Sequence, residues 1–367
     1  MNKAYRYRIY PTKEQEELLI KTFGCCRFIY NTMLADKIEE YKTTGKMLKT
    51  TPAKYKVKYP WLKEVDSLAL ANVQLHLERA YRSFFEQPAT GFPSFKSKHR
   101  SRESYTTNVV NGNIDISDGR LKLPKLKSIK IKLHRIAPEH FVLKSVTISR
   151  EPSGKYYASL LYEYAVCESQ AKCSITKDYR ILGMDYAMNG MAVCSDGRRL
   201  AYPGYYKEAE SKLAREQRKL SRCEKGSSNY RKQKKKVALH HEKIRNQRKD
   251  FMHKLSRELV VRYDAIAVED LNMKALSQCL HLGKGIMDNG YGMFLNLLSY
   301  KLREGGKKLV KVGRFFPSSK LCSRCGEIKS ELKLSDRKYI CSCGYSEDRD
   351  VNAAINIREE GKRILCA

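Results

Sequence analysis

Residues 181–197, ILGMDYAMNGMAVCSDG, place one carboxylate, Asp185, inside an otherwise apolar run. Its two halves, ILGMDYA and GMAVCSDG, have the composition of paired strands, and RRLAYP at 198–203 follows as a third. Burying an unpaired charge in a strand is costly. The stretch therefore predicts a sheet in which Asp185 is the strongest candidate for a functional residue.

Two further acids stand at the ends of predicted elements. Glu269 ends the strand candidate DAIAVEDL, and Asp350 opens the last helix, DVNAAINIREEG. An aspartate in a strand, a glutamate ending a later strand and an aspartate on a following helix recur in the RNase H-like nuclease architecture, where they converge at one edge of a sheet. Converging carboxylates repel unless divalent cations lie between them, and two Mg²⁺ ions about 3.5–4 Å apart assist phosphodiester displacement. We therefore predict that Asp185, Glu269 and Asp350 are catalytic magnesium ligands. The nearby acids that we assign instead to turns or surface are Asp196, Asp264 and Asp270.

The last helix follows three acids in four positions, in EDRDVNAAINI at 347–357. A helix that begins near Asp350 puts an apolar face on the sheet and points this acid inward. An acid just before a helix caps its N-terminus, so we predict Asp348 as the cap and Glu347 as solvated. The residues that form the apolar face are Ala353, Ala354 and Ile357.

Four of the 12 cysteines form one group, with Cys322 and Cys325 separated by fifteen residues from Cys341 and Cys343. Two close thiolate pairs at this distance are typical of a structural zinc ribbon. The second pair is the shorter Cys-x-Cys form, and coincidental clustering is the alternative. Four protein ligands would close the metal site, so the predicted role of zinc is folding and not catalysis.

The chain has 72 Lys and Arg residues against 40 acids, a formal charge of +32. This excess predicts a nucleic-acid partner, because self-repulsion opposes a compact fold unless a polyanion neutralises it. A solubilising surface is the alternative, but it would spread the charge evenly. The segment at 231–249, within a predicted helix from about 206 to 261, instead holds nine basic residues and one acid, Glu242. We predict nucleic-acid contact there, with a solvated helix face as the alternative.

The first part of the chain predicts a strand, then helices, then more strands. Residues 1–10 alternate like a strand, and a helix opens at Thr12, whose capping box is completed by Gln15. Further helical pattern runs over 67–85, and residues 105–164 change to a period of two, which predicts a β-barrel or sandwich completed by the N-terminal strand. Lysines and tyrosines alternate on these strands, for contact with nucleic acid or for packing. The apolar stripe predicted to pack the first helix is Leu19, Phe23, Cys26, Tyr30 and Met33.

At 367 residues the chain is long enough for two or three domains, and CESQAKCSITKD at 167–178 is a predicted linker. No apolar run approaches the roughly 20 residues that span a bilayer. The start, MNKAYRYRIY, lacks the apolar region of a signal peptide. We therefore expect no membrane partner and a cytoplasmic protein.

Together these residues resemble the TnpB (OrfB) family, the insertion-sequence-encoded RNA-guided nucleases related to type V CRISPR effectors. The resemblance runs through nearly the whole chain. Its motifs are YRYRIYPTKEQEELLIKTFGCCRFIYN, LPKLKSIKIKLHR, LGMDYAMNGMAVCSDG, AIAVEDLNM, FFPSSKLCSRCG and CSCGYSEDRDVNAAINI. Many members have glycine where this chain has Ala187, and the shorter second cysteine pair is the other departure.

The resemblance implies a multidomain α+β protein. A wedge-type β-barrel (1–12 and 104–172) would contain an inserted helical recognition bundle (13–103), and an RNase H-like (RuvC) α/β nuclease domain (173–367) would carry the zinc ribbon (315–347). It also implies a transposon-derived guide RNA, recognition of a short flanking motif, and cleavage of double-stranded DNA, with single-stranded DNA also bound, by Asp185, Glu269 and Asp350. The alternatives are a guided repressor that binds without cutting and, third, a zinc-ribbon RNA-binding structural protein.

Overall fold

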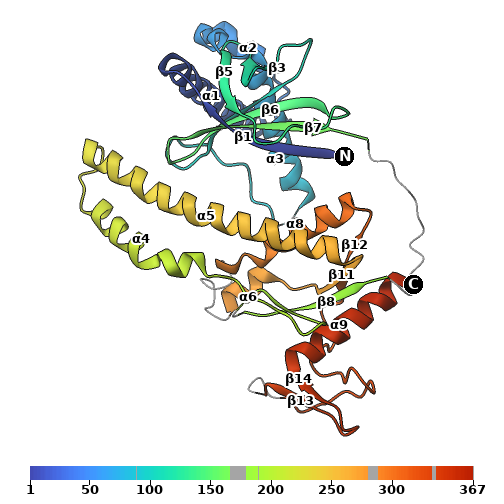
Figure 1. Cartoon of the computed structure of the whole chain (residues 1–367). Helices are drawn as coiled ribbons and strands as arrows, with labels where there is room; N and C mark the ends of the chain where they lie inside the picture. The colour runs from blue at the N-terminus through green and yellow to red at the C-terminus, as the bar shows by residue number, and fades with distance from the viewer. Residues whose placement is uncertain (88, 166–178, 189, 280–287, 333–335, 367) are drawn as a thin grey trace. The chain divides into compact units, whose positions relative to one another are not determined.

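The computed structural model describes all residues except 88, 166–178, 189, 280–287, 333–335 and 367 (Figure 1). The chain forms two compact units, Met1–Cys167 and Glu168–Ala367. The predicted linker at 167–178 lies outside the described residues. Within the described ranges, no helix combines the length and the apolar sequence needed to cross a bilayer.

The first unit contains one seven-stranded sheet in the order β2-β6-β7-β1-β5-β4-β3. The N-terminal strand β1 lies inside this sheet, antiparallel to both β7 and β5, which confirms that it completes the sheet. The edge strands β2 and β3 do not pair with each other in the described residues, so the sheet is a half-barrel, and the predicted barrel is confirmed in part. The strands are β1 (Asn2–Tyr10), β2 (Glu103–Asn108), β3 (Asp115–Ser117), β4 (Arg120–Leu123), β5 (Lys127–Lys132), β6 (Val142–Arg150) and β7 (Tyr156–Glu163).

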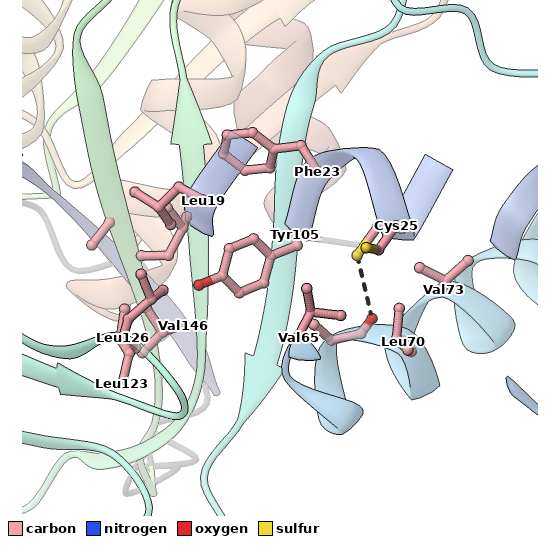
Figure 2. Close-up of a cluster of buried hydrophobic side chains, with 14 of the residues drawn as sticks. Leu19, Phe23, Cys25, Val65, Leu70, Val73, Tyr105, Leu123, Leu126 and Val146 are labelled. Carbon is pink, nitrogen blue, oxygen red and sulfur yellow. Dashed lines mark hydrogen bonds between the residues drawn. The ribbon is translucent and has the colours of Figure 1, made fainter. Parts of the chain in front are cut away.

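Helices between β1 and β2 pack on this sheet. The predicted capping box is present, because Thr12 accepts a hydrogen bond from the Gln15 amide and the Gln15 side chain accepts one from Thr12. Figure 2 shows Tyr105 of β2 in a core with Phe23, whose ring centroid lies 5.9 Å away, and with Val73. The helices are α1 (Lys13–Thr44), α2 (Pro52–Lys58), the 3-10 helix η1 (Pro60–Glu64) and α3 (Ser67–Glu86). The apolar stripe predicted for α1 is buried, and so are the strand tyrosines Tyr7, Tyr105, Tyr156 and Tyr162. Those four tyrosines therefore pack the core. The assignment of the sheet as a wedge-type barrel and of the helices as a recognition bundle remains a prediction.

The second unit is built on a five-stranded sheet in the order β10-β9-β8-β11-β12. The three strands from β10 to β8 are antiparallel, whereas β8, β11 and β12 run parallel. This mixed arrangement is in keeping with the predicted RNase H-like class. The strands are β8 (Ile181–Tyr186), β9 (Ala192–Cys194), β10 (Arg199–Leu200), β11 (Ala265–Glu269) and β12 (Lys308–Val312).

The helix predicted from about 206 to 261 is in fact two helices, α4 (Tyr205–Ser221) and α5 (Ser228–Arg262). The chain turns between them because Gly226 adopts φ 94° and Ser227 then caps α5 by accepting a hydrogen bond from the Tyr230 amide. The two helices pack through an apolar cluster that includes Leu213, Val237 and Ile244. The other helices of this unit are α6 (Met273–Cys279), α8 (Tyr291–Glu304) and α9 (Arg349–Cys366).

Helix α9 packs against β8 and β11 at unusually short range. A Cβ on Gly183 of β8 would lie 2.0 Å from the Ala354 carbonyl oxygen, and one on Gly361 of α9 would lie 2.4 Å from the Ala267 Cβ. The predicted docking face is buried, since Ala353 and Ala354 are 1 % and 0 % exposed. The two glycines therefore set how closely the helix that carries Asp350 approaches the sheet.

We expect Gly183→Ala to destabilise the second unit by roughly 3 kcal/mol, at the upper end for overpacking, because the clash is with backbone atoms. Chemical denaturation of the full chain measures the loss. Gly292→Ala is the matched control, since Gly292 lies in α8 with no atom within 4 Å of its Cβ position. The control should leave stability unchanged or raise it by about 0.5–1 kcal/mol. Equal stability of the two variants would contradict the packing argument.

Candidate active site

The three predicted acids come from three elements of the second unit. Asp185 is next to last in β8 and Glu269 is last in β11. Because β8 and β11 are parallel neighbours and Met184 pairs with Val268, the two acids end adjacent strands at the same edge of the sheet. Asp350 is the second residue of α9, in its first turn.

The charges of these acids act on one another. Burial and then the charges of Glu269 and Asp350 raise the pKa of Asp185 to about 8, while the charge of Arg349 opposes the rise. A carboxyl group responds in this way when other carboxylates lie near it in a site of low polarity. The structure thus brings together the three acids that the sequence predicted, while their catalytic role remains a prediction.

Two arginines that the sequence reasoning missed face Asp350. Arg349 Nη2 lies 3.2 Å from Asp350 Oδ1. Arg199 of β10 lies 2.7 Å from Asp348 Oδ2 and 3.9 Å from Asp350 Oδ2. Arg349 stands between two acids in the sequence, which is a local signal, whereas nothing in the sequence relates Arg199 to a helix that begins 150 residues later.

The two acids before α9, Asp348 and Glu347, have different structural roles. Asp348 Oδ1 accepts hydrogen bonds from the Asp350 and Val351 amides, so the predicted cap is confirmed. Glu347 was predicted to be solvated, and its side chain is exposed only in part. It lies in β14 (Ser346–Asp348), is half-buried, and its Oε1 accepts a hydrogen bond from the Asp348 amide.

Glu269 is held by Ser318, whose Oγ donates a hydrogen bond of 2.5 Å to Oε1. Tyr291 of α8 is 1 % exposed, and its ring centroid is 4.7 Å from that of Tyr186, the residue after Asp185. Burial and then the charges of Asp185 and Glu269 raise the pKa of Tyr291. The sequence reasoning missed both Ser318 and Tyr291, since a serine in a loop and an aromatic residue in a helix carry no distinctive pattern.

The three acids assigned to turns or surface each have other partners. Asp196 accepts hydrogen bonds from Arg198 and from the Tyr263 hydroxyl. The partners of Asp264 are Arg180 and Lys307, and those of Asp270 are Lys311 and Arg314. Satisfied ion pairs of this kind fit the surface role predicted for them.

The four cysteines predicted to bind zinc converge. Their sulfur atoms all lie within 4.8 Å of one another, with 3.8 Å between Cys322 and Cys343 and 3.6 Å between Cys325 and Cys341. A tetrahedral zinc site with Zn–S bonds of ~2.3 Å places its sulfurs ~3.8 Å apart, so the geometry fits. The ribbon also contains β13 (Lys338–Ile340) paired with β14. In the described residues these thiols form the tight group of metal-ligand atoms, and the three carboxylates converge less closely.

Two basic surfaces lie on the second unit. The predicted basic segment lies on α5, where most of its lysines are exposed but Arg248 pairs with Asp288 at 2.9 Å. A hollow of about 520 Å³ lies beside β12 and is lined by Arg303 and Lys308 among others. Within the described part of the chain these last two cations have no ion-pair partner, so their charge is available to an anionic ligand.

Three family models match the chain. An OrfB model of IS605-type elements, described as "Probable transposase", matches residues 164–280, and a companion model described as "Helix-turn-helix domain" matches 1–46. A model described as "Cas12f1-like, TNB domain" matches 291–357, which includes the four cysteines. Residues 1–46 form a strand and one long helix, so the name of the second model does not describe their structure.

Curated relatives match over almost the full length. A protein of Streptomyces pristinaespiralis named "Putative RNA-guided DNA endonuclease" is 33% identical over 371 residues, covering 98% of this chain and 90% of the relative. A protein of Escherichia coli K12 with the same description is 30% identical and covers 99% and 93%. The solved Cas12f1–sgRNA–target DNA complex contains a chain with a TM-score of 0.59 at 13% identity, with 98% of both chains covered. That last likeness concerns the fold alone.

Proposed function

This chain belongs to the OrfB (TnpB) family, and we propose on that premise that it is an RNA-guided, magnesium-dependent DNA endonuclease. The observation that carries the proposal is the cluster of Asp185, Glu269 and Asp350 at one edge of the sheet, where burial and the two neighbouring charges raise the pKa of Asp185 to about 8. A structural or purely binding protein gains nothing from carboxylates that repel one another.

The donor set fits magnesium, which prefers carboxylate oxygens. Asp185, Glu269 and Asp350 would hold the ions, and bound Mg²⁺ would supply Lewis-acid stabilisation of the attacking and leaving oxygens of a phosphodiester. The protein holds the three half-buried acids in position through β8, β11 and the cap of α9. Arg199 and Arg349 balance the charge of Asp350 in the protein itself.

The cysteine cluster would hold one structural zinc ion. Four thiolates close its coordination sphere, so it would have no open position for a substrate. Its role in the proposal is to stabilise the ribbon that leads into α9.

The nucleic-acid partners are argued from charge. A formal charge of +32 and the exposed lysines of α5 suit the phosphates of a guide RNA and of its DNA target, double-stranded before cleavage and partly single-stranded once opened. In such a system the RNA selects the sequence, while the protein reads backbone shape and a short flanking motif. This proposal includes a transposon-derived guide and a short flanking motif. It also includes the predicted domains, which are the wedge-type barrel (1–12 with 104–172), the recognition bundle (13–103), the nuclease domain (173–367) and the zinc ribbon (315–347).

The test is a cleavage assay on the protein purified with its co-expressed RNA. The RNA is sequenced, and a target plasmid with a randomised flank is incubated with magnesium or with EDTA. We expect cutting with magnesium at plasmids that share one flanking motif, and no cutting with EDTA. Target binding without cutting under either condition would support the guided repressor, and zinc-dependent RNA binding without target binding would support the structural alternative.

A further inference from the structure

One serine donates the only hydrogen bond that the described part of the protein makes to the side chain of Glu269. Ser318 Oγ donates to Oε1 at 2.5 Å, and Ser318 is 6 % exposed. Because Oε1 already accepts this hydrogen bond, Oε2 is the oxygen that is more open to another ligand. A hydrogen bond to one oxygen of a carboxylate sets the plane of the group and so the direction in which its other oxygen points.

Ser318 is itself held by the helix that carries Asp350. Asn356 of α9 donates through Nδ2 to the Ser318 carbonyl at 2.8 Å and to the Leu321 carbonyl at 2.7 Å. Asn356 is 3 % exposed, so both bonds lie in the interior, where an unpaired amide would be costly. Two acids on different elements, Glu269 and Asp350, are therefore placed through one helix.

The same helix face also holds the cysteine knuckle. Asn352, one turn before Asn356 and 0 % exposed, donates to the Leu321 carbonyl at 2.8 Å and accepts from the Ser323 amide at 3.0 Å. Leu321 precedes Cys322, and Ser323 follows it. Hydrogen bonds thus run without interruption from the backbone around a predicted zinc ligand, through two buried asparagines, to Ser318 and Glu269.

We propose that Ser318, held by Asn356, is a positioning residue that orients the Glu269 carboxylate for a divalent cation and joins that carboxylate to the folded cysteine ribbon. The inference rests on the proposed function, because it assumes that Glu269 is a metal ligand. It assigns no chemistry to Ser318, whose hydroxyl acts only through Glu269. Groups that orient a metal ligand typically change metal affinity by about 10–100-fold when removed.

The test measures cation binding as well as activity. Mn²⁺, a paramagnetic substitute for Mg²⁺, is titrated into the full-length protein with its RNA and without DNA, and free Mn²⁺ is followed by electron paramagnetic resonance. We expect Ser318→Ala to weaken Mn²⁺ binding by about 10-fold and to raise the Mg²⁺ concentration for half-maximal cleavage by a similar factor. Zinc content should stay at the wild-type value. Ser318→Thr keeps the hydroxyl and should restore most of the Mn²⁺ affinity.

The neighbouring serine supplies the matched control. Ser319 is half-buried and makes no side-chain hydrogen bond in the described residues, so Ser319→Ala should bind Mn²⁺ like the wild type. If Ser318→Ala folds poorly, Ser318→Cys preserves the size of the side chain and replaces the hydroxyl by a weak donor. Wild-type Mn²⁺ affinity in both Ser318→Ala and Ser318→Cys would overturn the inference. Absence of Mn²⁺ binding and cleavage in the wild type would instead overturn the proposed function.

The route through Asn356 is tested by a double-mutant cycle. If Asn356 acts on Glu269 through Ser318, the loss of Mn²⁺ affinity in Ser318→Ala/Asn356→Ala will be smaller than the product of the two single losses. Multiplicative losses would show that Asn356 does not act through Ser318.

Discussion

Replacement of Asp185 by asparagine is expected to abolish target cleavage and, at the same time, to raise the stability of the magnesium-free protein. Cleavage should fall by about 10³-fold or more, because one anionic ligand of the proposed metal site is lost. Stability should rise because asparagine keeps the shape of the side chain without a charge that burial and the carboxylates of Glu269 and Asp350 oppose.

The pH dependence of this gain follows from the sign of the pKa shift. The pKa of Asp185 rises from an ordinary value of 3.8 to about 8 in the folded chain, so the folded chain binds an extra proton between these pH values. The free energy of unfolding of the wild type therefore falls as pH rises from about 4 to 8, and below pH 4 the acid has no effect. At ~1.4 kcal/mol per pKa unit, and allowing for partial exposure, Asp185→Asn should gain roughly 2–4 kcal/mol near pH 8 and almost nothing at pH 4.

Thermal or chemical unfolding in EDTA across this pH range measures the effect. Added Mg²⁺ should stabilise the wild type and leave Asp185→Asn almost unchanged, since only the wild type keeps all three ligands. Asp196→Asn is the control, because we expect it to lower the free energy of unfolding where Asp185→Asn raises it. Burial opposes ionisation of Asp196, but hydrogen bonds from Tyr263 and Arg198 lower its pKa, so its loss should reduce stability while cleavage persists. A pH-independent difference between wild type and Asp185→Asn would refute the buried-charge account.

Cys322→Ser is expected to remove zinc and to unfold the ribbon. Structural zinc contributes on the order of 10–16 kcal/mol to the folding of isolated zinc-finger peptides, which is more than the net stability of most domains. Metal analysis should therefore drop from about one zinc per chain to a small fraction of that. Cleavage should also be lost, because the Ser323 amide would no longer be presented to Asn352 at the start of α9.

The thiol control is Cys366→Ser. Cys366 is an exposed free thiol at the end of α9 and is not part of the four-sulfur group. This variant should keep its zinc, its soluble yield and its cleavage activity. Full zinc content in Cys322→Ser would show that the cluster does not bind the metal through all four thiols.

Local patterns were enough to predict most elements of the fold. The Thr12 capping box, the helix over 67–85 and the strand around Asp185 are present as predicted, because each depends on neighbours in sequence. The break between α4 and α5 has a local signal, the turn residues GSSN at 226–229, but the prediction of one helix passed over it. The predicted barrel is present as a half-barrel, because closure depends on whether the edge strands β2 and β3 meet, which no local pattern reports.

Some residues of the candidate site could likewise be predicted from local sequence, and others could not. Charge in an apolar strand, the spacing of the cysteine pairs and the acid before a helix all have local physical causes, so Asp185, the four thiols and the Asp348 cap could be predicted from the chain alone. Arg199, Ser318 and Asn356 could not, because each contacts a residue far from it in sequence, and such a contact exists only in the folded chain. Composition and periodicity determine which acids are present on which elements. The close approach of α9 to β8 at Gly183 determines which other side chains surround and orient those acids.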